Sequence, residues 1–306
     1  MRKENFEFVS KDGFTYNAVL WLSDEQPKQM IQIVHGMTEH MERYEAFASY
    51  FTKLGIAVAG FDLRGHGKSD TNSSCAYFKE GDFLKTLEDI HDFHLLLKQR
   101  FESQKHILLG FSLGSFLVRE YLSNYDHQFF GAIIAGTGQQ PSFLLKIIKG
   151  LVKKQIHQIG YTQTNDFISN LSFGTYNKKF APNKTNVDWL CSDNKQLELY
   201  IQDAYIKNAI SAGLFYELLD SMDRLTIKNV YSRWDKNMPI LLISGAEDPV
   251  GDGGKGVLTV KKAMEKAGLK QVTCKLYPHG RHDIFHEYQL GIVENLFEDI
   301  KNWLEV

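Results

Sequence analysis

The chain begins with two short segments in which apolar and polar positions alternate. These segments, Asn5–Val9 and Tyr16–Trp21, flank Lys11, Asp12 and Gly13. Alternation with a period of two is typical of a strand that turns one face to a core, and a polar stretch with glycine between two such strands favours a tight turn. We therefore predict an antiparallel hairpin at the edge of a sheet.

Beyond this hairpin the pattern changes to short continuous apolar runs, which are typical of strands buried on both faces of a parallel sheet. We expect such strands at Met30–Val34, Ile56–Phe61, Ile107–Leu109, Ala132–Ala135, Ile240–Ile243 and Val272–Leu276. Between them, apolar residues three or four positions apart predict helices. One of these helices is marked by Leu84, Leu87, Ile90 and His94. Repeated strand–helix units after an edge hairpin predict an α/β fold with a doubly wound, mostly parallel sheet.

The strand–helix alternation stops between Gln139 and about Asn237. We expect this stretch to be a helical cap inserted between the sixth and seventh strands. The domain organisation predicted on this basis is a core of residues 1–138 and 238–306 and a cap of residues 139–237.

One predicted cap helix has a distinct apolar face. The face consists of Leu144, Ile147, Ile148, Leu151 and Val152. A face of this kind either packs against neighbouring cap helices or receives acyl chains or a lipid surface. On the second interpretation, Leu144, Ile148 and Leu151 contact the substrate.

Composition and charge exclude several functional classes. Hydrophobic residues make up 43% of the 306 residues, enough for a large core, and a formal net charge of −2 provides no overall basic field for nucleic acid. The N-terminus lacks the apolar core of a secretory signal, and no stretch approaches the roughly 20 apolar residues of a membrane span. Three cysteines, Cys75, Cys191 and Cys274, have no metal-ligand spacing. We therefore expect a cytoplasmic protein without a nucleic-acid partner or stable membrane insertion.

The motif that carries the most chemical information is Gly110-Phe111-Ser112-Leu113-Gly114, where an apolar run ends and helical spacing begins. A Gly-x-Ser-x-Gly sequence between a strand and a helix predicts a nucleophile elbow, in which a Cβ at either glycine would collide with neighbouring backbone. The N-terminus of the following helix would direct its amides toward an oxyanion formed at Ser112.

A serine hydroxyl acts as a nucleophile at neutral pH only with an imidazole base, which in turn needs a carboxylate partner. We favour Asp248, at the turn just beyond the seventh predicted strand, and His282, which the residues 278–281 can carry over the edge of the sheet. Ser112, Asp248 and His282 would then each follow a separate strand. The rival acids are Glu247 and Asp252, and the rival bases are His279 and His286.

The third predicted strand leads into His35-Gly36-Met37-Thr38-Glu39-His40. The glycine lets backbone amides turn inward, so the N–H groups of Met37 and Leu113 would form an oxyanion hole. His35 and His40 also permit a metal interpretation, but no third ligand keeps a matching spacing. We expect neither a metal nor a cofactor.

The fourth predicted strand is followed by the polar loop from Asp62 to Asp70, which is rich in glycine and charge. The loop lacks the spacing of a phosphate-binding Gly-x-x-x-x-Gly-Lys-Ser/Thr motif. We interpret it as structural, with Asp62 and Arg64 forming an ion pair that braces it.

Five ordered motifs together resemble one family: HGMTEH, DLRGHGKSD, GFSLG, SGAEDPV and YPHGRHD. They resemble the α/β-hydrolases related to monoacylglycerol lipase and bacterial lysophospholipase, which are also grouped as serine-aminopeptidase-like hydrolases. The resemblance covers nearly the whole chain and implies an α/β-hydrolase fold. It also implies Ser112 as nucleophile, His282 as base, Asp248 as acid, and the amides of Met37 and Leu113 as oxyanion hole. Ser115 departs from the further glycine that many members have, and Trp189 and Tyr200 resemble family sequence without an assigned role.

This resemblance implies an esterase that acts on monoacyl lipid esters, such as a monoacylglycerol or a lysophospholipid, with at most transient contact to a lipid surface. An alternative within the enzyme class is an aminopeptidase or amidase, which would need an acidic group in the cap to hold a substrate ammonium. Candidates for that acid are Asp188, Asp193 and Asp203. A second alternative is a binding module that keeps the hydrolase fold without catalysis.

Overall fold

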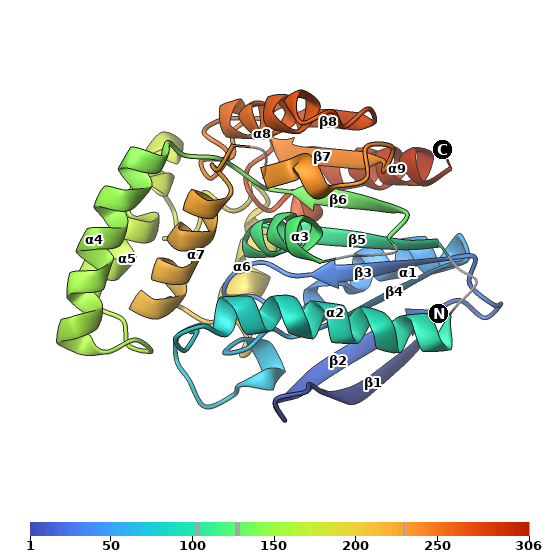
Figure 1. The fold of residues 1–306 in the computed structure, drawn as a ribbon, viewed down its shortest axis with the longest axis horizontal. Helices are drawn as coiled ribbons and strands as arrows, with labels where there is room; N and C mark the ends of the chain where they lie inside the picture. The colour runs from blue at the N-terminus through green and yellow to red at the C-terminus, as the bar shows by residue number, and fades with distance from the viewer. Residues whose placement is uncertain (102–104, 126–128, 229, 306) are drawn as a thin grey trace.

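The computed structural model describes residues 1–101, 105–125, 129–228 and 230–305, which form an eight-stranded sheet with helices on both faces (Figure 1). The strand order is β1-β2-β4-β3-β5-β6-β7-β8. Strands β1 and β2 form an antiparallel hairpin, β2 is antiparallel to β4, and the remaining neighbours are parallel. The predicted edge hairpin and the doubly wound, mostly parallel sheet are confirmed. The strands are β1 Arg2–Val9, β2 Thr15–Leu22, β3 Gln29–Val34, β4 Ile56–Phe61, β5 Lys105–Phe111, β6 Gly131–Ala135, β7 Ile240–Gly245 and β8 Val272–Tyr277.

Strands β4, β6 and β7 are buried along their whole length, as the continuous apolar runs predict. Strand β8 differs; it is the last strand of the sheet and lies beside β7. Its Thr273 and Lys275 are exposed, and Val272, Cys274 and Leu276 are half-buried. The prediction that β8 is buried on both faces is therefore wrong.

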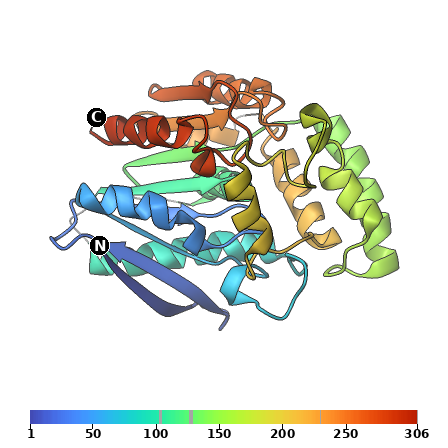
Figure 2. The ribbon, with the colours of Figure 1, turned by 180° about the vertical axis from the view of Figure 1, so that it is seen from behind.

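Two separate apolar cores lie on the two faces of the sheet. Helices α1 (Glu45–Lys53) and α9 (Ile292–Leu304) cover one face, and α2 (Asp82–Arg100), α3 (Leu113–Asn124) and α8 (Lys255–Lys266) cover the other (Figures 1 and 2). Helices α1, α2, α3 and α8 each lie between two strands in the chain and confirm the helices predicted there.

The predicted stripe of α2 contains one error. Leu84 is 52% exposed, whereas Phe83, Leu87 and Ile90 are buried against the core. The stripe passes through Phe83 because positions 83, 87 and 90 are spaced by four and three residues and so share one helix face.

Between β6 and β7 the chain leaves the sheet and runs, within the described residues, through four α-helices and two short 3-10 helices, Tyr176–Phe180 and Val230–Arg233 (Figure 1). The α-helices are α4 (Ser142–Ile159), α5 (Asp166–Phe173), α6 (Asn194–Gln202) and α7 (Ala212–Arg224). We refer to residues 139–237 as the inserted segment. Helices α4, α5 and α7 lie together beyond one end of the sheet (Figures 1 and 2).

The apolar residues of α4 divide between two faces. Leu145 and Val152 are buried, and Ile148 packs against the same core. In contrast, Leu144, Ile147 and Leu151 are exposed, with exposed fractions of 36%, 59% and 44%. The five residues predicted as one face therefore serve two roles, and only Ile148 and Val152 pack inward.

Among residues 1–101, 105–125, 129–228 and 230–305, no helix combines the length and apolar character needed to cross a bilayer.

Candidate active site

Ser112 occupies the sharp turn between β5 and α3. Its backbone has φ 51° and ψ −117°. Residues other than glycine rarely adopt a positive φ of this kind. The turn is held by hydrogen bonds from Ser112 N to Ala135 O (3.0 Å) and from Ser115 N to Ser112 O (2.8 Å). A strained, over-determined turn of this kind is the geometry expected for a nucleophile elbow.

The two glycines of the motif allow this turn to pack closely. A Cβ at Gly114 would lie 1.9 Å from the backbone oxygen of Val34, and a Cβ at Gly110 would lie 2.3 Å from the backbone oxygen of Gly114. Both obstacles are backbone atoms of neighbouring strand and helix, so neither can move aside like a flexible side chain.

We expect Gly114→Ala to lower the free energy of unfolding by about 3 kcal/mol or more, because the methyl group overlaps the backbone of β3. The matched control is Gly150→Ala in α4, where a Cβ meets nothing within 4 Å. Removing a glycine from that helix interior is expected to stabilise the protein by about 0.5–1 kcal/mol. Urea unfolding of both variants measures the difference, and equal stabilities would contradict the steric argument.

The side chains of Ser112, His282 and Asp248 form one hydrogen-bonded chain. His282 Nε2 lies 2.9 Å from Ser112 Oγ, and His282 Nδ1 lies 2.9 Å from Asp248 Oδ2. Asp248 also accepts hydrogen bonds from Val250 N (2.8 Å) and Ser244 Oγ (3.1 Å). Ser112 is 9% exposed, while Asp248 is fully buried.

Two opposing effects set the protonation of His282. Burial disfavours the imidazolium, but the adjacent Asp248 carboxylate favours it, and the net result raises the pKa of His282 above its ordinary value. At neutral pH the ring is therefore a stronger base than a free histidine, as a group that accepts a serine proton needs to be.

The rival residues lie outside this chain. His279 is exposed and faces Glu247 at 3.3 Å, and Asp252 is exposed and lies 3.9 Å from Lys255. His286 is buried, but its Nδ1 faces Asp283 at 2.8 Å. The structure brings together the three favoured residues and none of the four rivals.

The ring of His282 packs against two aromatic side chains. Its centroid is 5.0 Å from that of Phe111 and 5.2 Å from that of Trp189. The backbone of the inserted segment also joins the histidine loop, because Asp283 N donates to Leu190 O at 2.6 Å. The sequence alone assigns Trp189 no role, since only the fold brings residue 189 next to residue 282.

The loop after β3 turns sharply at Met37, whose amide is predicted to form an oxyanion hole with that of Leu113. Leu113 is the first residue of α3, so its amide has no acceptor within that helix. Thr38, which follows Met37, has φ 69°. Gly36 N donates to Glu39 Oε1 at 2.6 Å, and this bond closes the turn around Met37.

The side chain of His35 stabilises the same turn. Its Nδ1 bonds Gly36 O (2.7 Å), and its Nε2 accepts from Leu63 N (2.9 Å). Burial lowers the pKa of His35 to about 3, so the ring is neutral. Its protonated Nδ1 donates to Gly36 O, and the lone pair of Nε2 accepts from Leu63 N. His40 instead faces the inserted segment, with Nε2 2.8 Å from Asp203 Oδ2.

The predicted ion pair between Asp62 and Arg64 is wrong. Asp62 accepts hydrogen bonds from the backbone N–H groups of Met41 (2.7 Å) and Lys68 (2.8 Å). Arg64 points to the other side of the loop and pairs with Asp12 (2.9 Å) and Asp89 (2.8 Å). Both residues brace the loop, but through different partners.

The three residues expected to contact substrate are spread over α4. Ile148 packs toward the core, whereas Leu144 and Leu151 lie on the exposed face. None of the hydrogen-bond or ring contacts of the triad residues described above involves them. Their role in substrate binding stays a prediction.

Comparison with known proteins identifies the family. The family model described as serine aminopeptidase, S33, matches residues 25–289. The chain is 23% identical to human (Homo sapiens) monoglyceride lipase over 302 residues, which covers 97% of this chain and 88% of the lipase. It is 24% identical to an uncharacterized abhydrolase domain-containing protein of Dictyostelium discoideum over 97% of this chain, and it spans 29% of that longer relative.

The fold is shared with solved structures. The crystal structure of a thermostable carboxyl esterase from Bacillus coagulans, in complex with glycerol, superposes with a TM-score of 0.88 at 24% identity and covers 99% of each chain. Similarity at this level of identity establishes the α/β-hydrolase fold. Because the family model spans most of the chain and the fold agrees, the protein belongs to the serine aminopeptidase S33 family of α/β-hydrolases.

Proposed function

We propose that the protein is a serine hydrolase that cleaves carboxylic esters through an acyl-enzyme, with monoacyl lipid esters as its substrates. The observation that carries the proposal is the hydrogen-bonded chain from Ser112 Oγ through both ring nitrogens of His282 to Asp248, at 2.9 Å for each step. The monoglyceride lipases among its relatives support the ester class.

In the first half-reaction Ser112 Oγ bonds to the ester carbonyl carbon while its proton passes to His282 Nε2. The negative charge on the carbonyl oxygen is stabilised by the amides of Met37 and Leu113, and Asp248 stabilises the imidazolium. The C–O bond of the ester then breaks, and the leaving alcohol takes the proton from His282.

In the second half-reaction water attacks the acyl-enzyme. His282 accepts a proton from the water, and the tetrahedral intermediate collapses with release of the carboxylic acid. Ser112 Oγ regains its proton from His282, so the enzyme returns to its starting state. No metal or cofactor takes part in this scheme.

The preference for lipid esters draws support from the exposed face of α4. Phe143, Ile147 and Leu151 are 69%, 59% and 44% exposed, and Leu144 extends the same patch. Exposed apolar side chains on an otherwise lysine-rich helix suit contact with an aggregated lipid substrate. On this proposal the inserted segment is a cap, Leu144 and Leu151 meet the lipid surface, and Ile148 supports the helix from beneath.

The aminopeptidase alternative receives no support from the three acids proposed for it. Asp188 accepts from Thr185 N (3.0 Å) and Lys184 N (2.6 Å), and Asp193 accepts from Lys195 N (2.9 Å) at the start of α6. Asp203 faces His40. Each carboxylate already has internal partners, so a substrate ammonium would have to compete with them.

The test is a substrate panel measured with wild-type protein and with Ser112→Ala as the blank. The panel runs from p-nitrophenyl acetate to p-nitrophenyl palmitate and includes monooleoylglycerol and an aminoacyl p-nitroanilide. We expect hydrolysis of the esters, with kcat/KM rising with acyl-chain length, and no hydrolysis of the anilide. Cleavage of the anilide alone would establish the peptidase alternative. Inertness toward every substrate would favour a binding protein.

A further inference from the structure

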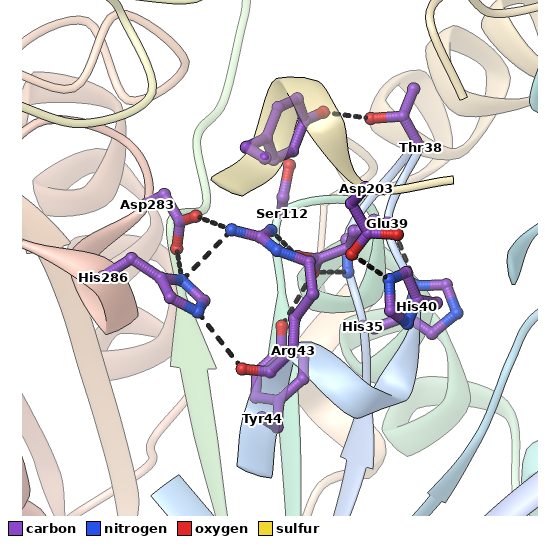
Figure 3. Close-up of polar contacts among 12 residues, drawn as sticks. His35, Thr38, Glu39, His40, Arg43, Tyr44, Ser112, Asp203, Asp283 and His286 are labelled. Carbon is purple, nitrogen blue, oxygen red and sulfur yellow. Dashed lines mark hydrogen bonds and ion pairs between the residues drawn. The ribbon is translucent and has the colours of Figure 1, made fainter. Parts of the chain in front are cut away.

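A buried cluster of charges lies beside the triad and takes no part in the scheme above. Arg43 follows the oxyanion loop and contacts two carboxylates, Glu39 and Asp283 (Figure 3). The exposed fractions of the three side chains are 10% for Arg43, 3% for Glu39 and 4% for Asp283. The cluster therefore places two anions and one cation in a largely dry interior.

Each carboxylate belongs to a loop of the candidate active site. Glu39 Oε1 accepts from Gly36 N (2.6 Å) and from the Tyr44 hydroxyl (2.8 Å), so it holds the residue immediately before Met37. Asp283 immediately follows His282 in the chain. The Arg43 guanidinium donates through Nη1 to Glu39 Oε2 and through Nη2 to Asp283 Oδ2 at 2.7 Å.

The remaining contacts surround the guanidinium and its partner Asp283, and one of them joins Arg43 Nη2 to His286 Nδ1 at 3.3 Å. His286 Nδ1 faces Asp283 Oδ1 (2.8 Å), and His286 Nε2 faces the backbone oxygen of Arg43 (3.1 Å). The ring of Tyr200, from α6, lies 4.8 Å from the guanidinium carbon, and its hydroxyl is 2.8 Å from Thr38 Oγ1. A planar guanidinium can satisfy two carboxylates and an aromatic face at once, and a lysine ammonium cannot reproduce that geometry.

Stability alone is a poor explanation for such a cluster. Removing buried charges from water carries a large desolvation penalty, and well-packed apolar side chains of similar volume are often as stable or more so. What an apolar replacement does not provide is a directional link between two loops that lie 240 residues apart in sequence.

We propose that Arg43 is a positioning residue. It binds Glu39 of the oxyanion loop and Asp283 of the His282 loop, and so holds both loops in place around Ser112. This inference rests on the proposed function, because it assigns Arg43 to the same hydrolytic site. Arg43 itself contacts neither the reacting atoms nor the three triad side chains among the bonds that the structure describes.

The electrostatics of the cluster add a second consequence. The charged groups that act on His282 are Asp248, Asp283 and Glu39, and Arg43 offsets part of the charge of the last two. Against the effect of burial, His286 and Arg43 hold the pKa of Asp283 well below its usual range. Without Arg43, two less compensated anions would favour the imidazolium, and the pKa of His282 would rise further.

The test compares Arg43→Met and Arg43→Lys with wild type on p-nitrophenyl acetate and on a long-chain ester. We expect Arg43→Met to lower kcat by about 10²-fold on both substrates, because a displacement of about 1 Å in a catalytic group has an effect of that order. KM should change by less than about threefold. The acid limb of the kcat/KM profile should move to higher pH, and Arg43→Lys should recover little of the loss.

Arg64→Met is the matched control, since Arg64 is also a buried guanidinium between two carboxylates, Asp12 and Asp89. It should lower the urea midpoint without moving kcat or the pH profile of the folded protein. Unchanged kcat and pH profile in Arg43→Met would overturn the positioning role. So would a loss confined to KM for one type of leaving alcohol, which would make Arg43 a substrate-binding residue. Failure of the proposed function is a separate outcome, because either the wild-type protein would then be inert toward every ester or Ser112→Ala would retain wild-type activity.

Discussion

Replacing Ser112 with alanine is expected to reduce kcat for ester hydrolysis by about 10⁶-fold, which corresponds to about 8 kcal/mol of transition-state stabilisation. The variant removes only Oγ, the atom that bonds to the substrate in the proposed mechanism. It leaves the oxyanion amides and the substrate-binding surface in place, so a residual acceleration of about 10³–10⁴-fold over water remains. The effect is large because the covalent route is lost altogether.

The fold of this variant should be intact. Ser112 already adopts φ 51°, and alanine has the same Cβ, so the turn is no more strained than before. Circular dichroism and urea unfolding check this point. A fluorophosphonate phosphonylates activated serines with loss of fluoride, so it should label the wild-type protein stoichiometrically and leave Ser112→Ala unlabelled.

Ser115→Ala is the matched control. Ser115 lies one turn further along α3, is fully buried, and within the described part of the chain its Oγ has no hydrogen-bond partner. The activity of Ser115→Ala should remain within about twofold of wild type, because the hydroxyl that it lacks bonds neither His282 nor any other polar group of the described residues. Equal activity of Ser112→Ala and wild type, with full labelling in both, would assign the nucleophile to another residue.

The sheet could be predicted from the sequence because a strand that is buried on both faces has apolar residues at consecutive positions. Strands β4 and β7 are continuous apolar runs, and the boundaries predicted from them are close to those observed. Strand β8 is the exception: one of its faces is exposed, as its polar residues Thr273 and Lys275 already indicate. The hydrophobicity of a run therefore predicts a strand more reliably than it predicts the position of that strand in the sheet.

The candidate triad could also be predicted, since each member follows a strand and the carboxyl ends of parallel strands meet at one edge. What could not be predicted is where polar side chains point within a loop. Asp62 and Arg64 are two residues apart and have opposite charges, yet they turn to opposite sides. Proximity along the chain does not determine direction, because each side chain follows the φ and ψ of its own residue.

Contacts between loops that are far apart in the chain could not be predicted from the sequence. Trp189 reaches His282 from the inserted segment, and Arg43 reaches Asp283 across 240 positions. No periodicity or spacing in the sequence indicates that the residues of either pair are in contact. Helix α4 shows a related limit, because its apolar residues exceed one face, and the pattern does not say which of them a neighbouring helix covers.

Asp248→Asn is expected to lower kcat by about 10⁴-fold at neutral pH, although the two side chains have nearly the same shape. The reason lies in the partners of Asp248. Val250 N donates to Oδ1 at 2.8 Å, so in the variant the amide oxygen must occupy that position. The amide NH₂ then takes the place of Oδ2 and faces His282 Nδ1, which lies 2.9 Å away.

An amide donor at that position forces His282 into the wrong tautomer. Nδ1 must accept a hydrogen bond, so the single proton of the neutral ring moves to Nε2 and points at Ser112 Oγ. A protonated Nε2 cannot accept the serine proton. The nucleophile is still present in this variant, but its base is blocked, which distinguishes the expected result from that of Ser112→Ala.

The pH dependence separates this mechanism from simple misfolding. In the wild-type protein Asp248 raises the pKa of His282, so activity should rise as the pH increases through that elevated pKa and the ring becomes neutral. Asp248→Asn removes the anion, so the acid limb of kcat/KM should move to lower pH while the plateau falls. Asp252→Asn is the control, because Asp252 is exposed and pairs only loosely with Lys255 at 3.9 Å. If Asp248→Asn kept the wild-type plateau and limb, the carboxylate partner of His282 would have to be another acid, and Asp283, one residue along the chain, would be the next to replace.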